Sequence, residues 1–159
     1  MGGLSVDVKI RQAHKEDAEA LTMLAMISKR SNGYDDAFMA ASAERLRVTP
    51  AQLEMHNYWV AECNTPCGFV CLQVDPEGNF GKLAALFIHP DWQRRGVGLM
   101  LWTALEMSAR EKGLTALHLN ADPEAETFYR NLGFSTVGRV QSSSIPGRML
   151  PHMRIDLPI

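Results

Sequence analysis

The sequence predicts an α/β protein with a mixed central sheet of about seven strands and helices on its flanks. Three strand-like segments, 58–63, 68–75 and 80–88, are separated only by turn residues, and strands that meander in this way pair antiparallel. A long helical pattern at 97–112 separates the third of these strands from a further strand at 116–121. A strand–helix–strand crossover implies parallel pairing, so the sheet is expected to begin antiparallel and to become parallel at its middle pair.

The part of the chain before these strands is predicted to hold one strand and three helices. Residues 6–10 alternate apolar and polar side chains, as a half-buried strand does. Apolar residues then recur at helical spacing over 18–28, and Asp17 is the candidate N-cap. A weaker helical pattern covers 35–46, and Thr49, which a proline follows, is the expected cap of a short third helix.

Glycine and aspartate mark the ends of the later helices. Gly113 follows the long helix, and Gly133 ends the helix that Asp122 is expected to cap. Segments 134–140 and 149–157 are the predicted closing strands, joined by a polar loop.

Length and composition favour one globular domain over 1–159. The chain is 46% hydrophobic and 21% charged, with a formal net charge of -2, which argues against nucleic-acid binding. It shows neither an apolar run of membrane length nor a secretion signal, so we expect a cytoplasmic protein. Cys63, Cys67 and Cys71 fit no zinc spacing; we predict that they are reduced packing residues and that no metal is bound.

A basic segment with two glycines, QRRGVG at 93–98, lies directly before the long helix. A helix N-terminus leaves backbone N–H groups unpaired and carries partial positive charge, and phosphate is an anion that it commonly binds. The glycines let an anion approach the backbone closely, and the glutamine and arginines add donors and charge. The segment lacks the lysine and the third glycine of the best-known nucleotide loops, and a turn beside a solvated basic surface is the alternative interpretation.

A second segment points to the same kind of ligand. In ADPEAETFYRNLGF, residues 121–134, Tyr129 lies on the predicted helix, and Asn120 ends the strand before it. QRRGVG matches the Q/R-x-x-G-x-G/A acetyl-CoA motif of the GCN5-related N-acetyltransferase (GNAT) family, and the second segment matches that family's A-x-x-F-Y-x-x-x-G-F motif. In both motifs and in the order of its elements, the sequence resembles this family.

The resemblance implies the GNAT fold, in which the middle strands splay apart and admit acetyl-CoA. The strand that ends at Ile88 would pair its backbone with the pantetheine arm, as an added strand pairs with an open sheet edge. The diphosphate would lie on the N–H groups of 94–98. For Asn120, capping of the following turn is the alternative to a pantetheine contact. The implied cofactor contacts are Leu86, Phe87, Ile88, Gln93, Arg94, Arg95, Gly96, Val97, Gly98, Asn120, Phe128 and Tyr129.

The resemblance also implies direct attack of a neutral amine on the acetyl thioester. Tyr129 matches the family's usual acid, which would protonate the departing thiolate, whereas its spacing alone would make it a core aromatic residue. A backbone N–H near Phe87 or Ile88 would stabilise the oxyanion. Lys82 stands where many family members carry a glutamate, so the general base stays open. The candidates are Glu62, Asp122, Glu126, His118 or a water molecule.

The acceptor is expected to bind between the first helices and the last strands, at segments 30–39 and 141–153. Tyr34, Asp35 and Asp36 are candidates for an aromatic wall and a carboxylate that would hold a cationic amine. Helix capping is the alternative role for the aspartates.

The sequence thus predicts an acetyl-CoA-dependent N-acetyltransferase that acts on a primary amine, with a small molecule favoured as acceptor. The alternatives are a catalytically silent acyl-CoA sensor and an acetyltransferase of a protein or peptide amine. Neither nucleic acid nor membrane is an expected partner, and a homodimer is expected by analogy with the family. The identity of the acceptor and the length of the acyl group stay open.

Overall fold

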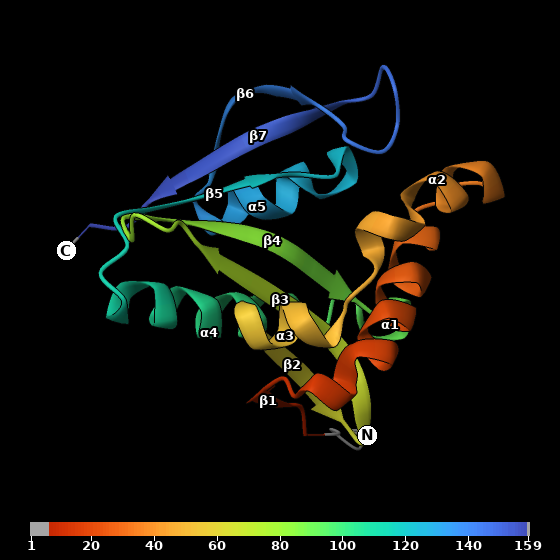
Figure 1. Cartoon of the computed structure of the whole chain (residues 1–159), viewed down its shortest axis with the longest axis horizontal. Coiled ribbons are helices and arrows are strands. Elements are labelled where there is room, and N and C mark those ends of the chain that lie inside the picture. Colours follow the sequence, from red (N-terminus) through yellow and green to blue (C-terminus); the bar gives the residue numbers. More distant parts are fainter. Residues whose placement is uncertain (1–6, 159) are drawn as a thin grey trace.

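The computed structural model describes residues 7–158 and has one seven-stranded sheet, in the order β1-β2-β3-β4-β5-β7-β6 (Figure 1). Neighbouring strands are antiparallel except β4 and β5, which are parallel. This confirms the predicted mixed α/β sheet. The first strand begins later than the predicted 6–10, whose first residue lies outside the described part. The strands are β1 (Lys9–Gln12), β2 (Asn57–Cys63), β3 (Thr65–Val74), β4 (Phe80–Ile88), β5 (Ala116–Asn120), β6 (Ser135–Gln141) and β7 (Met149–Asp156).

Helices cover both faces of the sheet. The side chains of α1, α2 and α3 pack into a core on one face, and those of α4 and α5 pack into a core on the other (Figure 1). The helices are α1 (Ala18–Arg30), α2 (Asp36–Leu46), α3 (Pro50–Met55), α4 (Val97–Glu111) and α5 (Glu126–Leu132), with short 3₁₀ turns at Lys15–Asp17, Pro90–Trp92 and Pro123–Ala125.

The side chains of β2 show why the sheet needs a cover on each face. Tyr58 and Val60 point into the core formed with the first three helices, whereas Trp59 and Ala61 point into the core formed with α4. Successive side chains of a strand project to opposite faces, so an uninterrupted apolar run forms a strand that is buried on both sides.

Two predicted helix caps have different outcomes. Thr49 caps α3 as predicted, because its hydroxyl accepts a hydrogen bond from the Gln52 N–H at 3.2 Å. Asp17 does not cap α1. The helix begins at Ala18 as predicted, but Asp17 is also the last residue of the preceding 3₁₀ turn, and its carboxylate accepts from the His14 N–H at 2.7 Å and pairs with Arg11 at 2.9 Å.

The three cysteines are buried and form no disulfide, which confirms that they are packing residues. Burial raises the pKa of the Cys67 and Cys71 thiols to about 12, so both stay protonated and behave as small apolar side chains. Residues 7–158 contain no group of three or more side chains placed to hold a metal ion. No helix in this part of the chain is both long and apolar enough to cross a bilayer.

The sheet splits between β4 and β5. Their pairing covers only three residue pairs, from Phe80 opposite Ala116 to Lys82 opposite His118. Beyond these pairs β5 continues along β7, and Figure 1 shows β4 and β5 diverging. The parallel middle pair therefore opens, as the fold prediction requires.

A bulge in β4 lies where the split begins. Cys71 of β3 is opposite Ala85, but Leu72 is opposite Leu83, so Ala84 has no partner of its own. An extra residue in one strand bends that strand and increases its twist. The bulge therefore helps to direct the second half of β4 away from β5.

Candidate functional site

A cavity of about 600 Å³ lies where β4 and β5 diverge. Its size falls in the usual range for pockets that enclose a small ligand. The second half of β4, the turn before α4, the start of α5, the first two helices and the β6–β7 loop all contribute to its wall. Ten of the predicted cofactor contacts line it: Leu86, Phe87, Ile88, Gln93, Arg94, Gly96, Gly98, Asn120, Phe128 and Tyr129.

The other two predicted cofactor contacts lie beside the cavity and do not line it within the described residues. Val97 is buried in the core as the first residue of α4. The Arg95 guanidinium lies over the ring of Trp92, 5.1 Å from its centroid. Arg95 can still add charge near the turn, but its side chain is directed to Trp92.

The edge of β4 that faces the cavity has free main-chain groups. From Leu83 onward β4 pairs with β3 on one side only, because its pairing with β5 ends at Lys82. Gln93 Nε2 donates a long hydrogen bond of 3.4 Å to the Ile88 carbonyl oxygen on this edge, and a bond of this length is weak. An unpaired strand edge is a template for an extended ligand that carries amide groups.

The turn at 93–98 exposes backbone N–H groups to the same cavity. Arg94 and Gly96 have positive φ angles of 65° and 81°, and α4 begins directly afterwards. No backbone hydrogen bond within residues 7–158 uses the N–H groups of Arg94, Arg95 or Gly96. Successive free N–H groups in such a turn form a concave site for an anion, and the helix dipole adds to it.

The two glycines of this turn serve different purposes. A Cβ on Gly96 would meet nothing within 4 Å, so glycine is needed there for its left-handed backbone. A Cβ on Gly98 would lie 3.1 Å from Cζ of Phe128, so the bare backbone gives room to this ring. The sequence interpretation assigned both glycines to the ligand and did not foresee the contact between Gly98 and α5.

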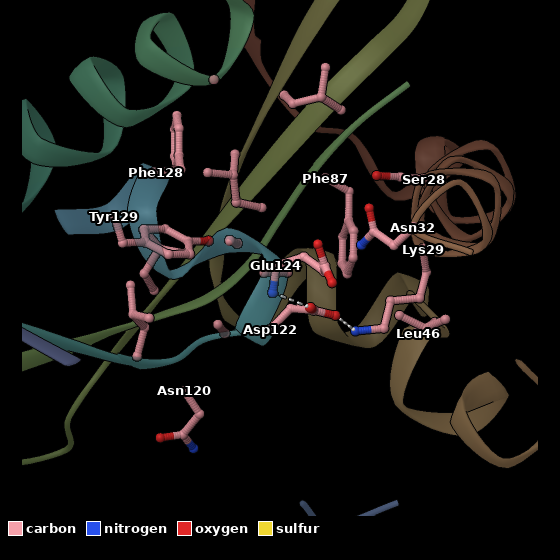
Figure 2. Close-up of a pocket in the computed structure, with 18 of the residues that line it drawn as sticks. Ser28, Lys29, Asn32, Leu46, Phe87, Asn120, Asp122, Glu124, Phe128 and Tyr129 are labelled. Carbon is pink, nitrogen blue, oxygen red and sulfur yellow. Dashed lines mark hydrogen bonds and ion pairs between the residues drawn. The ribbon is translucent and has the colours of Figure 1, made fainter. Parts of the chain in front are cut away.

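Tyr129 projects from α5 into the cavity, with its hydroxyl toward the interior (Figure 2). Its ring packs edge-on against Phe128 and Phe134, with centroids 5.3 and 5.8 Å away, and the residue is 7% exposed. Burial, and then the nearby charge of Asp122, raise the pKa of this phenol above its ordinary value. Tyr129 therefore stays protonated at neutral pH and can donate a proton.

Asp122 is the centre of a charged cluster formed by Lys29, Tyr34, Asp122 and Arg148. Its carboxylate forms an ion pair with Lys29 (Figure 2). It also accepts from the Tyr34 hydroxyl at 3.0 Å and lies 3.5 Å from Arg148 Nη2. Burial alone would raise the pKa of Asp122, but the hydrogen bond and charge of Lys29 outweigh it and lower the pKa. The cluster joins α1, the end of β5 and the β6–β7 loop.

Glu124 lines the cavity, although the sequence did not single it out. Figure 2 shows its carboxylate projecting into the cavity between Phe87 and Tyr129. Within residues 7–158 its side chain forms neither an ion pair nor a hydrogen bond, since only its backbone N–H bonds to Asp122 at 2.9 Å. The Asp-Pro start of the 3₁₀ turn is the sequence signal that could have pointed to it, since this turn places Glu124 as an exposed residue at the rim of the cavity.

The other candidate bases have partners of their own. Glu62 pairs with Arg11 at 3.2 Å, and Glu126 accepts from the Thr136 hydroxyl at 2.6 Å. His118 lies beside His152, and burial followed by the charge of His152 lowers its pKa. Among the four side chains that the sequence suggested, Asp122 is the one that lines the cavity as described.

The three predicted acceptor residues have different positions in the structure, and none of them lines the described cavity. Tyr34 stands behind the cavity wall, stacked on Phe38 and bonded to the lining residue Asp122. Asp35 caps α2 by accepting from the Phe38 N–H at 2.8 Å. Asp36 has an 89% exposed side chain that pairs with Arg30.

Asn120 lies at the open end of β5 and lines the cavity. Its Oδ1 is 2.7 Å from Nδ1 of His152 on β7, so its amide orientation is fixed from one side. Its Nδ2 group is left to donate to a ligand.

Comparison with known proteins gives the same family from sequence and from structure. Residues 54–136, just over half of the chain, match the acetyltransferase (GNAT) domain. Peptidyl-lysine N-acetyltransferase YjaB of Salmonella typhimurium is 28% identical over 154 residues, which cover 95% of this chain and 99% of that protein.

Two further relatives match over shorter segments. The uncharacterized N-acetyltransferase ycf52 of Gracilaria tenuistipitata var. liui is 41% identical over 49 residues, or 31% of this chain and 27% of that protein. A Bacillus subtilis relative is 32% identical over 73 residues, or 46% of this chain and 48% of its own length. The matched part of the chain thus spans less than half of the length of each of these two relatives.

Solved structures share the fold over nearly the whole chain. A GCN5-related N-acetyltransferase of Rhodopseudomonas palustris superposes with a TM-score of 0.79 at 24% identity, covering 98% of this chain and 100% of that one. The PaiA N-acetyltransferase of Thermoplasma acidophilum, solved in complex with coenzyme A, gives 0.79 at 18% identity, covering 95% and 99%. With the matched domain and this shared fold, the chain belongs to the GNAT acetyltransferase family.

Proposed function

We propose that the protein is an acetyl-CoA-dependent N-acetyltransferase that transfers an acetyl group to the primary amine of a small molecule. The observation that carries the proposal is the meeting of three features in one cavity: the unpaired edge of β4, the free N–H groups at 94–96 and the buried Tyr129 hydroxyl. An open strand edge suits the amide-containing pantetheine arm, and the turn suits a diphosphate.

The residues of this chain have distinct roles in the proposed reaction. Acetyl-CoA supplies an activated acetyl thioester. Leu86 and Ile88 pair their main-chain groups with the pantetheine arm, and Phe87 between them contributes to the cavity wall. Asn120 donates to the arm, and the turn at 94–98 holds the diphosphate. Tyr129 donates its proton to the sulfur as the carbon–sulfur bond breaks and the carbon–nitrogen bond forms.

The relatives and neighbours support the cofactor more than the acceptor. The Thermoplasma neighbour was solved with coenzyme A, and a Salmonella typhimurium neighbour was solved with its cofactor acetyl-CoA. The Salmonella relative is named as an enzyme that acts on peptidyl-lysine. We favour a small acceptor because α1, α2 and the β6–β7 loop enclose the acceptor end of the cavity. One domain over 1–159 and a cytoplasmic location are further proposals that rest on the sequence, and a homodimer is proposed by analogy with the family alone.

An acetyl-CoA thiol-release assay over amino acids, polyamines, aminoglycosides and peptides tests the enzyme proposal. We expect amine-dependent thiol release, together with calorimetric binding of coenzyme A. Binding without release by any amine would favour the silent sensor, and no binding at all would contradict the proposal. Arg154→Gln, on β7 and outside the described cavity lining, controls for the loss of a surface charge.

A further inference from the structure

Arg148, in the loop between β6 and β7, presents a fixed guanidinium to the cavity. Its Nη2 donates to the Tyr34 hydroxyl at 2.7 Å and lies 3.5 Å from Asp122 Oδ2. The guanidinium carbon lies 5.2 Å from the Tyr34 ring centroid and 4.9 Å from that of Phe38. Within residues 7–158, Nε and Nη1 of Arg148 have no hydrogen-bond partner. The guanidinium is therefore held in place through Nη2, and Nε and Nη1 remain available as donors to a ligand.

The charges at the acceptor end of the cavity do not balance. Lys29, Arg45 and Arg148 contribute three cations to the lining, and Asp122 and Glu124 contribute two carboxylates. Lys29 and Arg148 share the single carboxylate of Asp122, which leaves one net positive charge within this cluster. An acceptor with a negative group would compensate that charge, whereas a purely cationic acceptor would be repelled by it.

Glu124 provides the opposite charge close to the proposed chemistry. Its carboxylate projects between Phe87 and Tyr129 from the exposed rim of the cavity (Figure 2). Within residues 7–158 it forms no ion pair with another side chain. The nitrogen that attacks the thioester must come close to Tyr129, because this residue protonates the departing sulfur. A carboxylate without a protein partner at this place can bind an ammonium group and accept one of its protons.

We propose that the acceptor is a small amino acid: Glu124 receives its ammonium group, and the free edge of Arg148, beside Lys29, receives its carboxylate. This proposal rests on the acetyltransferase function proposed above. A guanidinium suits a carboxylate because its planar donors can bind both oxygens, and stacking on aromatic rings fixes its plane. Polyamines, aminoglycosides and lysine side chains within proteins lack a carboxylate near the reacting amine and fit this arrangement poorly.

The protons balance in this arrangement. Of the three ammonium protons, one stays on the amide nitrogen of the product. A second replaces the proton that Tyr129 gives to sulfur, and the third leaves to solvent through Glu124. Acetyl-CoA and the ammonium form of the amino acid thus yield the acetylated amino acid, coenzyme A and one proton.

The test compares α- and ω-amino acids with the carboxamide of each one, which has nearly the same shape but no negative charge, and kcat/KM is calculated on the neutral-amine fraction because the carboxamide also makes the amine less basic. We expect kcat/KM of the best amino acid to exceed that of its carboxamide about 10- to 100-fold. This is the ratio expected when one hydrogen bond to a charged group is lost. Arg148→Gln should remove most of this preference, mainly through KM. Arg148→Lys should restore part of it. Arg154→Gln should leave it unchanged. Equal use of both compounds by the native enzyme overturns the proposal.

Binding of the product provides a readout that does not need turnover. Acetylated amino acids and their carboxamides are titrated into the protein saturated with coenzyme A. We expect the acetylated amino acid to bind at least tenfold more tightly, and Arg148→Gln to abolish the difference. No difference in binding overturns the amino-acid proposal, even where thiol release shows that the enzyme proposal is correct. A difference without any thiol release supports the binding site and contradicts the enzyme proposal.

Glu124→Gln tests the ammonium partner, with Glu77→Gln, outside the described cavity lining, as its control. We expect Glu124→Gln to lower kcat/KM at least tenfold at pH 7 and to lose less at pH 9, where more of the amine is already neutral. Coenzyme A affinity should be unchanged. An unchanged pH profile of kcat/KM contradicts the role of Glu124.

Discussion

The Phe128 ring of α5 lies against Gly98 of α4, where an added Cβ would stand 3.1 Å from the ring. The QRRGVG motif and the ADPEAETFYRNLGF motif are therefore in contact, on the face of the sheet that α4 and α5 cover. Phe128 forms part of the cavity wall, and its position depends on the missing side chain of Gly98.

Gly98→Ala should displace Phe128 and weaken coenzyme A binding by about tenfold, measured by calorimetry. The free energy of unfolding should change by less than about 1 kcal/mol, because the gain in helix propensity offsets the crowding. Phe128→Leu in the Gly98→Ala background should recover part of the affinity. Unchanged affinity in Gly98→Ala would contradict the coupling.

Tyr129→Phe should lower kcat by about 10²- to 10⁴-fold and leave coenzyme A affinity nearly unchanged, because the ring stays and only the acid is lost. Single-turnover kinetics and calorimetry measure the two quantities. Phe134→Leu serves as a packing control, since Phe134 contacts Tyr129 but does not line the described cavity. A kcat loss as large in Phe134→Leu would favour a purely structural role.

The pH profile should show the raised pKa of Tyr129. An acid is active below its pKa, so a pKa above the ordinary value of about 10 keeps Tyr129 active across the neutral and mildly alkaline range. We expect no fall in kcat from this group between pH 7 and about pH 10. A fall in that range that disappears in Tyr129→Phe would show that the phenol is more acidic than its burial implies.

Lys29→Met should destabilise the protein by about 1–3 kcal/mol at pH 7, because it removes the main partner of a carboxylate whose side chain is 14% exposed. Asp122 has a lowered pKa in the folded state, so its contribution is present above its unfolded pKa near 4 and is lost as the pH falls below that. Urea unfolding at pH 7 and pH 3 should therefore show a smaller difference in Lys29→Met than in the native protein. Lys15→Met, an exposed lysine in the turn before α1, is the control.

Gly81→Ala should destabilise the closed end of the sheet by about 1–3 kcal/mol, measured by urea unfolding. An added Cβ would stand 2.8 Å from side-chain atoms of both Leu117 and Leu72 and 2.9 Å from Leu114. Gly138→Ala on β6 is the matched control, because a Cβ there meets nothing within 4 Å. Equal stability of the two variants would show that the core next to Gly81 can relax.

Periodicity was sufficient to predict most elements of the fold, because both the long α4 and the alternating strands carry strong patterns. It could not locate the bulge at Ala84, since the run from Leu83 to Ile88 is apolar throughout and shows no change of phase. Nor could it find Glu124 and Arg148 as a pair. They lie on separate loops, and only tertiary structure brings loops together at one cavity.

The bulge at Ala84 has a further consequence for how β4 tolerates change. Ala84 and Ala85 both pack toward the helices α1–α3, and only from Leu86 does the strand return to strict alternation, with Leu86 and Ile88 toward α4 and Phe87 opposite. Deletion of this one small residue would leave all three on their present sides, because Leu83 and Ala85 would then be opposite the adjacent residues Leu72 and Cys71 in a regular ladder. What the deletion would remove is the local bend, so a chain without Ala84 should keep the packing of β4 while the strand loses part of its divergence from β5.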